Sequence, residues 1–412
     1  MTAPSGAGRA LVVVVSQFPE PNETFIVREL GELVRLGFRV TILSLRPPPP
    51  AILDPEARAL LAHTVYPPPR LAAVLAGAWA TLRRRPRAAL RALGRGLADV
   101  LAALPTPLLA AKQLAVLPLT LAYGGGLPAE PVRLHAHFAS VPTAAVRVLA
   151  ALRGQRYGFT AHAWDIYVGE NARQLPARIA GADLVVTCTA YNRDVLRALA
   201  PTPADAAKVT LCHHGLDLAL YEPGRERAAD LIVGGASLVE KKGLAHLIAA
   251  CGRLSARGIP FRCVVIGEGP ERPRLEAQIA ALGLGDRIRL VGRIPHRDLV
   301  RHLREATVLA HPSIVDRRGS MDGIPNTILE AMAVETPVVA SRLSGIPEVV
   351  RPEETGLLVE PGDVDGLAAA LARLLGDPGL ARRLGAAGRA LVEERFDVRR
   401  NVAALAVLLA AP

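Results

Sequence analysis

Residues 11–45 read LVVVVSQFPEPNETFIVRELGELVRLGFRVTILSL, and the hydrophobic pattern changes twice along them. The run Leu11–Val15 is wholly apolar and rich in valine, which is typical of a strand buried on both faces of a sheet. Apolar residues then recur at helical spacing over Glu23–Leu36, and a second apolar run follows at Arg39–Leu45. Strand, amphipathic helix and strand in this order predict a βαβ unit, and hence an α/β domain with a parallel sheet.

The same alternation continues along the chain and separates into two series of expected strands. The first series continues with Arg133–Phe138, Tyr157–Thr160, Leu184–Cys188 and Lys208–His213. The second comprises Asp230–Val233, Arg262–Ile266, Ile288–Val291, Val308–His311, Pro337–Ala340 and Gly356–Val359. Between them, Gly215–Arg225 carries turn residues with little periodicity and is the expected linker. Two doubly wound domains facing each other would leave a cleft lined by strand C-terminal ends, where α/β sheets bind ligands.

Length and composition exclude several classes of protein. The chain has 412 residues, of which 50% are hydrophobic, which is too apolar for a disordered chain and long enough for two or three domains. No segment is expected to span a membrane, because charged residues and prolines interrupt the most apolar region, Leu71–Tyr123. The four cysteines form no CxxC pair and are expected to be reduced core residues. No signal peptide is expected before the strand at Leu11, so these features favour a cytoplasmic protein.

The positive charge is concentrated in one half of the chain. Residues 1–215 hold 23 Lys and Arg against 13 Asp and Glu, a net charge of +10, whereas residues 216–412 hold 26 against 25. Eight basic residues and one acidic residue, Asp99, fall between Arg70 and Lys112 within an Ala- and Leu-rich helical pattern. This segment fits either helices lying on an anionic membrane surface or ordinary solvated helices. Nucleic acid is not an expected partner, since no aromatic platform or recognition motif accompanies the basic residues.

The segment MDGIPNTILEAM, residues 321–332, is the most informative motif for function. A Gly-Pro turn followed by a helix whose first turn is Pro325–Ile328 would present free backbone N–H groups, and these attract anions. Gly323 would let phosphate or sugar oxygens approach the backbone, and Glu330 could accept hydrogen bonds from ribose hydroxyls. Read alone, the segment also fits an ordinary solvated helix start with an unremarkable glutamate.

Two further segments carry candidate phosphate-binding groups. In SLVEKKG, residues 237–243, Lys241 or Lys242 would suit a diphosphate as a point charge, although a lysine pair is also common in solvated turns. In IGEGP, residues 266–270, a strand runs into a glycine-rich turn, but Arg272 occupies the place of the third glycine of a dinucleotide fingerprint. The P-loop pattern GxxxxGK[ST] does not occur in the sequence.

The histidines do not form a recognisable metal motif. His135 and His137 share one face of an expected strand, and His213 and His214 are adjacent, but no HExxH or paired-cysteine pattern accompanies them. We therefore expect no metal site. His162, in FTAHAWDIY just after an expected strand, lies among polar residues and is the better candidate for a functional site.

Taken in order, these motifs resemble those of glycosyltransferase family 4, the retaining enzymes with a GT-B fold, and most closely its exopolysaccharide or colanic-acid branch. The resemblance extends from about Leu11 to Phe396. It rests on SQFPEPNETFIVREL, LHAHFAS, TAHAWDIY, SLVEKKG, VIGEGP, LVGRIP, MDGIPNTILEAMA, SGIPEVV and TGLLVEPGD. It implies two Rossmann-like domains facing a cleft: residues 1–218 binding the acceptor and residues 219–395 binding the nucleotide sugar. Residues 396–412 would form a helix that crosses back onto the first domain.

The resemblance also assigns roles to individual residues. It implies that Glu330 holds the donor ribose, that Asp322 faces the donor sugar, and that Lys242 binds the diphosphate. The backbone of Gly323, Ile324 and Pro325 would contact the sugar or phosphates, and Gly267, Arg293 and Ile294 would hold the base and ribose. His162 matches a histidine at the junction of sugar and acceptor. Three positions depart from the family pattern. Ser237 stands where an arginine is usual, Asp322 replaces the commoner glutamate, and Asn22–Glu23–Thr24 stands where many members have a Gly-Gly turn.

The implied activity is transfer of a sugar from a nucleotide diphosphate sugar to a glycan or polyprenyl-linked acceptor in cell-surface polysaccharide biosynthesis, with retention of configuration. No metal or other cofactor is expected, because Asp363-Val364-Asp365 is more typical of a helix cap than of a metal–diphosphate motif. The protein is expected in the cytoplasm, peripheral on the inner face of the plasma membrane. Two alternatives stay open: a non-catalytic GT-B partner subunit, which Ser237 favours, and a sugar-nucleotide epimerase.

Overall fold

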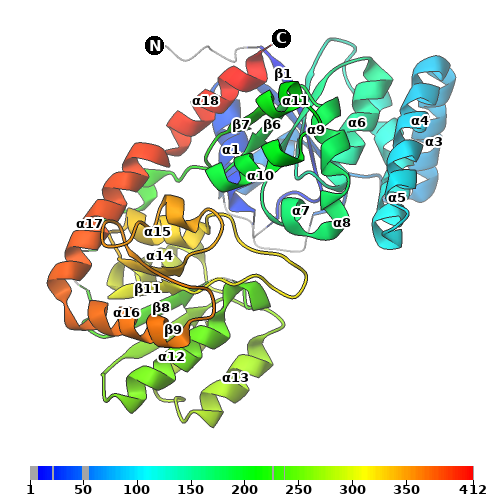
Figure 1. Cartoon of the computed structure of the whole chain (residues 1–412). Coiled ribbons are helices and arrows are strands. Elements are labelled where there is room, and N and C mark those ends of the chain that lie inside the picture. Colours follow the sequence, from blue (N-terminus) through cyan, green and yellow to red (C-terminus); the bar gives the residue numbers. More distant parts are fainter. Residues whose placement is uncertain (1–7, 21–22, 49–54, 225–226, 236, 412) are drawn as a thin grey trace. The chain divides into compact units, whose positions relative to one another are not determined.

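The computed structural model describes residues 8–20, 23–48, 55–224, 227–235 and 237–411 (Figure 1). Within these residues the chain forms two compact units. Unit 1 comprises Met1–Cys188, Asn192–Gly215 and Val398–Pro412, and unit 2 comprises Thr189–Tyr191 and Leu216–Asp397. Arg225, at the end of the expected linker, lies outside the described residues.

Unit 1 is built on a seven-stranded parallel sheet with the order β3-β2-β1-β4-β5-β6-β7. Its strands are β1 Ala10–Val15, β2 Arg39–Ser44, β3 Thr64–Val65, β4 Arg133–His137, β5 Tyr157–Ala161, β6 Leu184–Thr187 and β7 Val209–Leu211. Its helices are α1 Thr24–Arg35, α2 Pro55–Ala59, α3 Leu71–Arg84, α4 Pro86–Ala102, α5 Pro107–Gly126, α6 Val141–Arg153, α7 Trp164–Tyr167, α8 Gly169–Ala172, α9 Leu175–Gly181, α10 Ala190–Leu199, α11 Pro203–Ala207, α18 Val398–Ala410 and the 3₁₀ turn η1 Leu60–His63. The predicted βαβ unit is therefore present as β1, α1 and β2.

Alternate residues of β1 enter the cores on the two faces of this sheet. Val12 and Val14 pack in one cluster with residues of α5, α6 and α9, whereas Leu11, Val13 and Val15 pack in another with α1 and α18. Helices thus cover both faces, which explains why the strand is apolar throughout rather than alternating.

The sequence predicts no segment that could span a membrane, but α5 is an exception. By length and composition it is apolar enough to do so, yet half of its most apolar window is buried inside the fold. Its Leu117 and Leu121 pack against Val148 and Leu152, within a cluster that includes α6. The same apolar composition is therefore used for packing within unit 1.

Unit 2 contains a six-stranded parallel sheet with the order β10-β9-β8-β11-β12-β13. Its strands are β8 Leu231–Gly235, β9 Arg262–Ile266, β10 Ile288–Gly292, β11 Val308–His311, β12 Val338–Ser341 and β13 Leu357–Val359. Its helices are α12 Leu244–Ala256, α13 Arg272–Ala281, α14 His296–Glu305, α15 Asn326–Ala333, α16 Val364–Gly376 and α17 Pro378–Arg395, with 3₁₀ turns η2 Leu218–Leu220, η3 Glu240–Lys242 and η4 Ile346–Glu348. Both units are doubly wound, as predicted.

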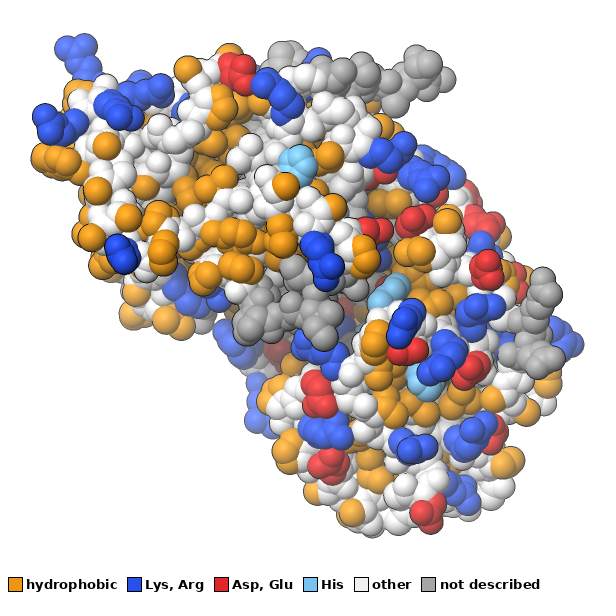
Figure 2. All heavy atoms as spheres, turned by 180° about the vertical axis from the view of Figure 1, so that it is seen from behind, with side chains coloured by type: hydrophobic (Ala, Val, Ile, Leu, Met, Phe, Trp, Pro, Cys, Tyr) orange, Lys and Arg blue, Asp and Glu red, His pale blue; other side chains and the backbone are white. Residues whose placement is uncertain are grey.

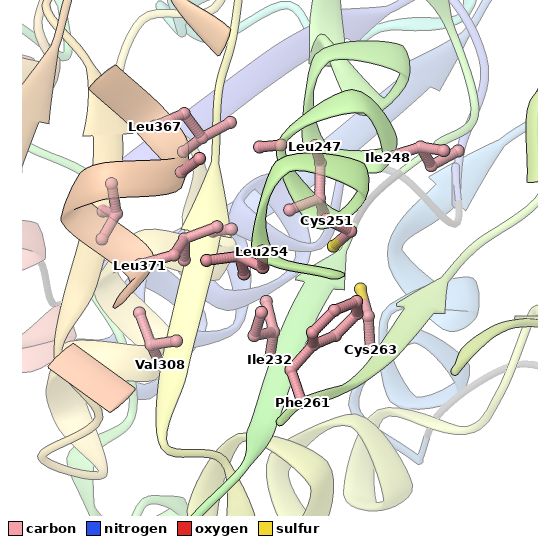
Figure 3. Packing of buried hydrophobic residues seen from close by; sticks show 14 of the residues in the cluster. Ile232, Leu247, Ile248, Cys251, Leu254, Phe261, Cys263, Val308, Leu367 and Leu371 are labelled. Atoms are coloured by element: carbon pink, nitrogen blue, oxygen red, sulfur yellow. The ribbon is translucent and has the colours of Figure 1, made fainter. Parts of the chain in front are cut away.

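One face of this second sheet is covered by α12 and α16. Leu254 of α12 and Leu371 of α16 pack over Ile232 and Val308 of the central strands (Figure 3). The thiols of Cys251 and Cys263 lie in the same core, and all four cysteines of the chain are free. The cysteines are therefore reduced, and two of them serve as small core residues.

The boundary between the units differs slightly from the expected one. Unit 1 ends at Gly215 rather than at residue 218, because the backbone N–H of Leu216 donates to the carbonyl of Phe396 over 2.8 Å and both side chains lie in a core cluster of unit 2. For the same reason the part of the C-terminal tail that joins unit 1 begins at Val398 rather than at residue 396. Helix α18 then packs on α1 within unit 1 (Figure 1).

Candidate functional site

The residues predicted to form a site in unit 2 follow the C-terminal ends of neighbouring strands. Strands β9 and β10 extend the sheet on one side of β8, whereas β11, β12 and β13 extend it on the other. The strand order therefore reverses between β8 and β11, and such a switch point is where doubly wound sheets bind ligands. Ser237 and Lys242 follow β8, Gly267 follows β9, Arg293 and Ile294 follow β10, and Asp322 follows β11.

Backbone hydrogen bonds join these loops into one continuous belt. The N–H of Gly267 donates to the carbonyl of Gly292 over 2.9 Å, and that of Leu238 donates to Glu268 over 2.9 Å. On the other side, the N–H of Ile314 donates to the carbonyl of Lys241 over 2.9 Å. The loops after β10, β9, β8 and β11 thus support one another along the edge of the sheet.

Gly243 allows the lysine loop to reach the β11 side. Its φ is +62°, and a Cβ at this position would lie 1.8 Å from the carbonyl oxygen of Pro312. A side chain would therefore both strain the backbone and push the two loops apart. The glycine that ends the SLVEKKG motif is required for the approach of Lys241 and Lys242 to Asp322.

Asp322 is the centre of a buried charged cluster. Its Oδ2 lies 2.9 Å from Nζ of Lys242 and accepts a hydrogen bond from Ser313 Oγ over 3.0 Å, while its Oδ1 lies 3.2 Å from Nζ of Lys241. Ser313 Oγ is also 2.9 Å from Nδ1 of His311. Because the serine proton points to the carboxylate, His311 donates from Nδ1 and is the neutral Nδ1–H tautomer.

The charges of this cluster are fixed by their neighbours. Burial alone would raise the pKa of Asp322, but the ammonium groups of Lys242 and Lys241 hold it well below its usual range. Burial, together with the positive charge of Lys242, lowers the pKa of His311 to about 3. At neutral pH the cluster therefore combines two ammonium groups, one carboxylate and a neutral imidazole. It keeps a net positive charge, which suits a polyanionic ligand.

Helix α15 adds a second anion-binding element to this loop. It begins at Asn326, and Pro325 is its N-cap rather than a residue of its first turn as predicted. Pro325 has an extended backbone and supplies no side-chain hydrogen bond to the helix start. Gly323 and Ile324 are half-buried in the turn between Asp322 and this cap. The first N–H groups of α15 therefore follow Asp322 within a few residues of the chain, and they attract negative charge.

Glu330, farther along α15, lies in a different polar group. Its Oε1 accepts a hydrogen bond from the hydroxyl of Tyr221 over 3.3 Å and lies 3.2 Å from Nε2 of His296. His296 begins α14, just beyond Arg293 and Ile294, so the structure connects Glu330 with the loop after β10. Tyr221 and His296 were not predicted from the sequence, since neither belongs to one of the motifs.

The other sequence expectations for unit 2 can be placed as follows. Ser237 is half-buried in the loop between β8 and η3. Asp363 is the N-cap of α16, and its side chain accepts a hydrogen bond from the N–H of Gly366 over 2.8 Å, so its predicted capping role is confirmed. Asp365 is exposed and pairs with Arg253.

In unit 1, His162 lies within a chain of imidazoles that are buried or, at His214, half-buried. His162 Nε2 lies 3.3 Å from Nδ1 of His137, and His162 Nδ1 lies 3.1 Å from Nε2 of His214. The chain ends at Glu29, whose Oε1 is 3.2 Å from Nε2 of His137. His162 is thus one link of a row of side chains that come from α1, β4 and the segments after β5 and β7.

The ionisation of this row follows from its burial. Burial and the neighbouring histidines lower the pKa of His162 well below its usual value, and burial lowers the pKa of His214 to about 4. Burial would raise the pKa of Glu29, but His137 holds it below its usual value. With their pKa values lowered, His162 and His214 are neutral at neutral pH, and a neutral imidazole donates from one ring nitrogen and accepts at the other.

Asp165 holds the loop that carries His162. Its fully buried carboxylate accepts hydrogen bonds from the N–H groups of His162 over 3.0 Å, Ala163 over 3.1 Å and Ala139 over 2.6 Å. The loops after β4 and β5 are thereby joined. This residue lies in the TAHAWDIY motif, but its role could not be deduced from the sequence because the partner loop is remote along the chain.

Within the described residues, one group of side chains brings three potential metal ligands together. Ligand atoms of His162, Cys188 and His214 lie within 4.8 Å of one another. Imidazole and thiolate donors suit zinc better than the magnesium that accompanies phosphates. The same ring nitrogens join the imidazole row, so a metal ion would compete with that hydrogen bonding.

The chain is similar to known glycosyltransferases, and the match to a family model covers most of unit 2. Residues 227–391 match the family described as Glycosyl transferases group 1, and this range contains the lysine cluster, Asp322 and Glu330. Over 378 residues the chain is 30% identical to WcaL of Escherichia coli (strain K12), named as a putative colanic acid biosynthesis glycosyltransferase, covering 86% of this chain and 88% of that protein. Over 179 residues it is 40% identical to the amylovoran biosynthesis glycosyltransferase AmsK of Erwinia amylovora, covering 43% of this chain and 42% of that protein.

A solved structure shares the fold over the whole chain. The crystal structure of Anabaena Alr3699/HepE in complex with UDP and glucose matches with a TM-score of 0.71 at 17% identity, covering 97% of this chain and 99% of that chain. At this identity the likeness concerns the fold alone.

Proposed function

The chain belongs to the glycosyl transferases group 1 family, and from this premise we propose that it transfers a sugar from a nucleotide diphosphate sugar to a glycan or polyprenyl-linked acceptor in cell-surface polysaccharide assembly. The chain is a glycosyltransferase, which leaves donor, acceptor and stereochemistry to be assigned. The observation that carries the assignment of the donor is the pairing of Lys241 and Lys242 with Asp322 at the switch point of unit 2. Fixed positive charge of this kind favours binding of a diphosphate.

In this proposal the donor lies along the belt of loops in unit 2. Lys242 and the first N–H groups of α15 stabilise the charge that develops on the departing diphosphate, and Lys241 keeps Asp322 ionised beside it. Glu330 accepts hydrogen bonds from the ribose, which fits its grouping with Tyr221 and His296. The backbone at Gly323, Ile324 and Pro325 contacts the sugar or phosphates, while Gly267, Arg293 and Ile294 support the nucleoside.

The donor loop lacks the arginine that usually precedes the lysine, since Ser237 occupies that place. A hydrogen bond to a charged group contributes about 1.5–3 kcal/mol, so its loss would weaken donor binding by roughly one to two orders of magnitude. Arg342, another arginine of unit 2, is exposed, and its Nε lies 3.0 Å from Oε1 of Glu360. Lys241, which contacts the opposite oxygen of Asp322, is better placed to compensate.

We expect transfer with retention of configuration and without a metal ion. Both oxygens of Asp322 are held by lysines, which suits a group that orients the sugar rather than a nucleophile that attacks it. Front-face attack by the acceptor is then the simpler route. The paired lysines supply charge stabilisation that a divalent ion provides in other transferases.

The acceptor is assigned to unit 1, where His162 and its imidazole row follow the ends of the strands. A polyprenyl-linked acceptor is anchored in a membrane while nucleotide sugars are cytoplasmic metabolites. The proposed location is therefore the cytoplasm, at the inner face of the plasma membrane.

Turnover of radiolabelled nucleotide sugars tests this function. We expect the purified chain to hydrolyse or transfer one member of a panel that includes UDP-glucose and GDP-mannose, in the presence of EDTA, and we expect Glu330→Ala to abolish that turnover. Nuclear magnetic resonance of the product would show the retained anomer. Full activity of Glu330→Ala would contradict the site assignment, and an inverted product would contradict the front-face route.

The two alternatives are not favoured, because the relatives of the chain are glycosyltransferases. A non-catalytic partner subunit, which Ser237 alone favours, would leave every donor in the panel unchanged. An epimerase would convert the free donor into an isomeric nucleotide sugar without an acceptor, and the same assay would detect that isomer.

A further inference from the structure

The connection between β3 and β4 is larger than the fold requires. A parallel crossover needs a single helix, yet α3, α4 and α5 all lie between these two strands. Helix α3 packs closely on α5: a Cβ on Gly77 would lie 2.9 Å from the Cβ of Ala122, and Thr81 Oγ1 donates to the carbonyl of Leu121 over 3.0 Å. The additional helices are thus firmly attached to unit 1.

The outer face of α3 is apolar. Leu71, Leu75 and Trp79 lie one helical turn apart in a single row, and they are 69%, 51% and 60% exposed. Arg83 continues the row at the C-terminal end of the helix. A solvated helix normally places its polar residues on the outer face, so this face is reversed.

Helix α4 combines an exposed apolar row with a basic one. Leu90, Leu97 and Leu101 form the apolar row, and all three are exposed. Arg87, Arg91 and Arg95, each one turn apart, lie beside that row and are also exposed. Leu104, in the connection between α4 and α5, and Leu108, at the start of α5, extend the exposed apolar surface.

Negative charge is missing from this surface. Asp99 is the one acidic residue between Leu71 and Lys112, and it is buried in an ion pair with Arg147 over 2.5 Å. Figure 2 shows hydrophobic and basic side chains standing together at the edge of unit 1 where these helices lie. The exposed surface of α3 and α4 therefore combines apolar side chains with arginines, and it carries no exposed acidic side chain.

We propose that α3 and α4 dock unit 1 onto the surface of an anionic lipid bilayer, with their apolar rows among the acyl-chain ends and their arginines at the headgroups. Leucine and tryptophan on one face with flanking arginines are the composition by which helices lie in a membrane interface. A second copy of this chain is a poorer occupant, because a symmetric contact would bring the arginine rows of two copies together. This inference deepens the proposed location at the inner face of the plasma membrane, and it rests on the surface of α3 and α4 rather than on the transferase activity.

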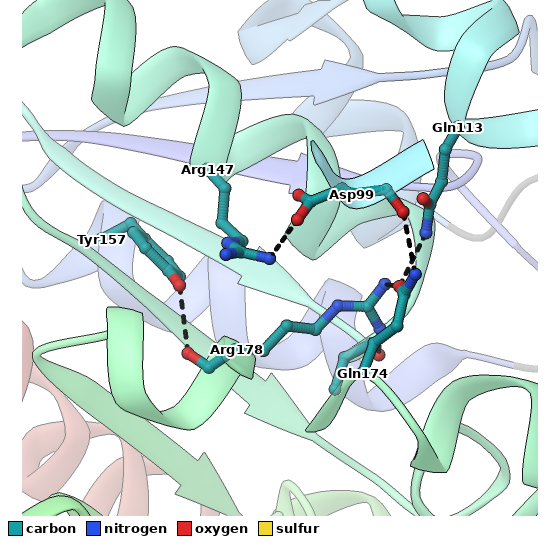
Figure 4. Close-up of polar contacts among 7 residues, drawn as sticks. Asp99, Gln113, Arg147, Tyr157, Gln174 and Arg178 are labelled. Atoms are coloured by element: carbon teal, nitrogen blue, oxygen red, sulfur yellow. Dashed lines mark hydrogen bonds and ion pairs between the residues drawn. The ribbon is translucent and has the colours of Figure 1, made fainter. Parts of the chain in front are cut away.

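A buried polar network joins the docking surface of α3 and α4 to the loop that carries His162. On α4, Asp99 pairs with Arg147 of α6, and its carbonyl accepts from Nε2 of Gln174 over 3.0 Å (Figure 4). Gln174 in turn accepts from Arg178, which is fully buried and also donates to the carbonyl of Ala139.

Ala139 completes the connection, since its N–H donates to Asp165, the carboxylate that holds the His162 loop. The path from α4 to this loop runs through buried, hydrogen-bonded groups and contains no long flexible segment. Docking of α3 and α4 would therefore fix the height of His162 relative to the bilayer.

Sedimentation with vesicles tests the docking. We expect the purified chain to sediment with phosphatidylglycerol-containing vesicles and to remain in solution with phosphatidylcholine alone. Each arginine near the surface contributes about a fivefold increase in partitioning, so Arg87→Gln/Arg91→Gln/Arg95→Gln should lower binding about a hundredfold. Leu75→Glu/Trp79→Glu should lower it comparably, whereas the control Leu282→Glu/Val407→Glu, at exposed apolar positions elsewhere, should not.

Tryptophan fluorescence gives a second readout that does not require folding of a charged variant. The chain has two tryptophans, so Trp164→Phe leaves Trp79 as the only one. Its emission should shift to shorter wavelength on anionic vesicles and be quenched by brominated lipids. No shift and no preference for anionic vesicles would overturn the proposal. A dimer that Leu75→Glu/Trp79→Glu converts to a monomer, without vesicle binding, would also overturn it and assign the surface to a second copy.

Discussion

Lys242 and Asp322 are eighty residues apart in the sequence, yet Nζ of the lysine lies 2.9 Å from Oδ2 of the aspartate. The pair bridges the loops after β8 and β11, the two strands between which the order of the sheet reverses. In the proposed function an arriving diphosphate competes with Asp322 for this ammonium group. The pair thus holds Lys242 in place before the donor binds.

Substitution of Lys242 should weaken binding of a nucleoside diphosphate. Lys242→Met removes a charged contact that contributes about 1.5–3 kcal/mol to binding. The Kd of this variant for a nucleoside diphosphate should therefore rise roughly 10- to 100-fold. Lys241→Met should have a smaller effect, because Lys241 is the more exposed of the two. Calorimetric titration with UDP and GDP measures both, and Arg253→Met, at an exposed ion pair of unit 2, is the control. An unchanged Kd for Lys242→Met would remove this residue from the site.

The side chain of Glu330 should contribute to binding of the nucleoside part of the donor and not to binding of its diphosphate. Glu330→Ala is expected to weaken UDP binding roughly 10- to 100-fold, because hydrogen bonds to the ribose are lost, while inhibition by inorganic pyrophosphate stays within about twofold. Lys242→Met should weaken both ligands. If Glu330→Ala weakens UDP and pyrophosphate equally, the substitution acts through disruption of α15 rather than through the ribose.

Gly243 offers a test of the belt of loops with a closely matched control. Gly258 has φ +68° and a Cβ added there would meet no atom within 4 Å, whereas Gly243 has φ +62° and its Cβ would lie 1.8 Å from the Pro312 oxygen. Gly258→Ala should cost about 1–2 kcal/mol of backbone strain alone. Gly243→Ala should cost about 1–3 kcal/mol more, because the loops must separate. Urea unfolding measures both, and equal midpoints would show that this loop contact is not needed.

The imidazole row should make unit 1 sensitive to mild acid. The pKa of His214 is lowered to about 4 in the folded chain, and the pKa of His162 also lies well below its usual value. The unfolded chain therefore binds more protons below about pH 6.5, and stability is lost as the pH falls from about 6.5 toward 4. Each such histidine lowers the free energy of unfolding by at most about 1.4 kcal/mol for each pH unit of acidification in this window.

His214→Asn measures the contribution of one link of that row. The slope of its free energy of unfolding against pH, between about pH 6.5 and 5, should be smaller than that of the parent. The difference should correspond to about one fewer proton taken up on unfolding. The control is His302→Asn, at a half-buried histidine of α14 in unit 2 that is not part of the row. A slope that His214→Asn does not alter would mean that this imidazole titrates normally.

The fold followed closely from the sequence because its signals are local. The apolar run at Leu11–Val15 and the helical period after it predict β1, α1 and β2 without reference to the rest of the chain. β3 was missed because Thr64–Val65 is too short to show a period. The boundary at Gly215 was placed three residues late, since the contact of Leu216 with Phe396 joins remote segments.

The candidate site was only partly predictable for the same reason. Lys242, Asp322 and Glu330 belong to motifs, but the pairing of the first two depends on how Gly243 packs against Pro312. Tyr221 and His296 acquire a role only because the linker and the loop after β10 meet at α15. Contacts between loops depend on tertiary packing and leave no periodic trace in the sequence.

The reversed face of α3 was also beyond the sequence. Composition identified an Arg-rich, Leu-rich segment that fitted either a membrane surface or solvated helices. Which residues of α3 point outward is set by the packing of Gly77 and Thr81 on α5, and that packing exposes Trp79.

The most direct test of the donor assignment is thermal unfolding of the chain with EDTA and a panel of nucleotide sugars. A ligand at about 100 times its Kd stabilises the folded state by about 2.7 kcal/mol, which gives a shift of several degrees. We predict that one nucleotide sugar raises the midpoint of the parent chain and not that of Lys241→Met/Lys242→Met. A panel that leaves the parent unchanged, or a shift that persists in the double variant, would contradict a diphosphate site at these lysines.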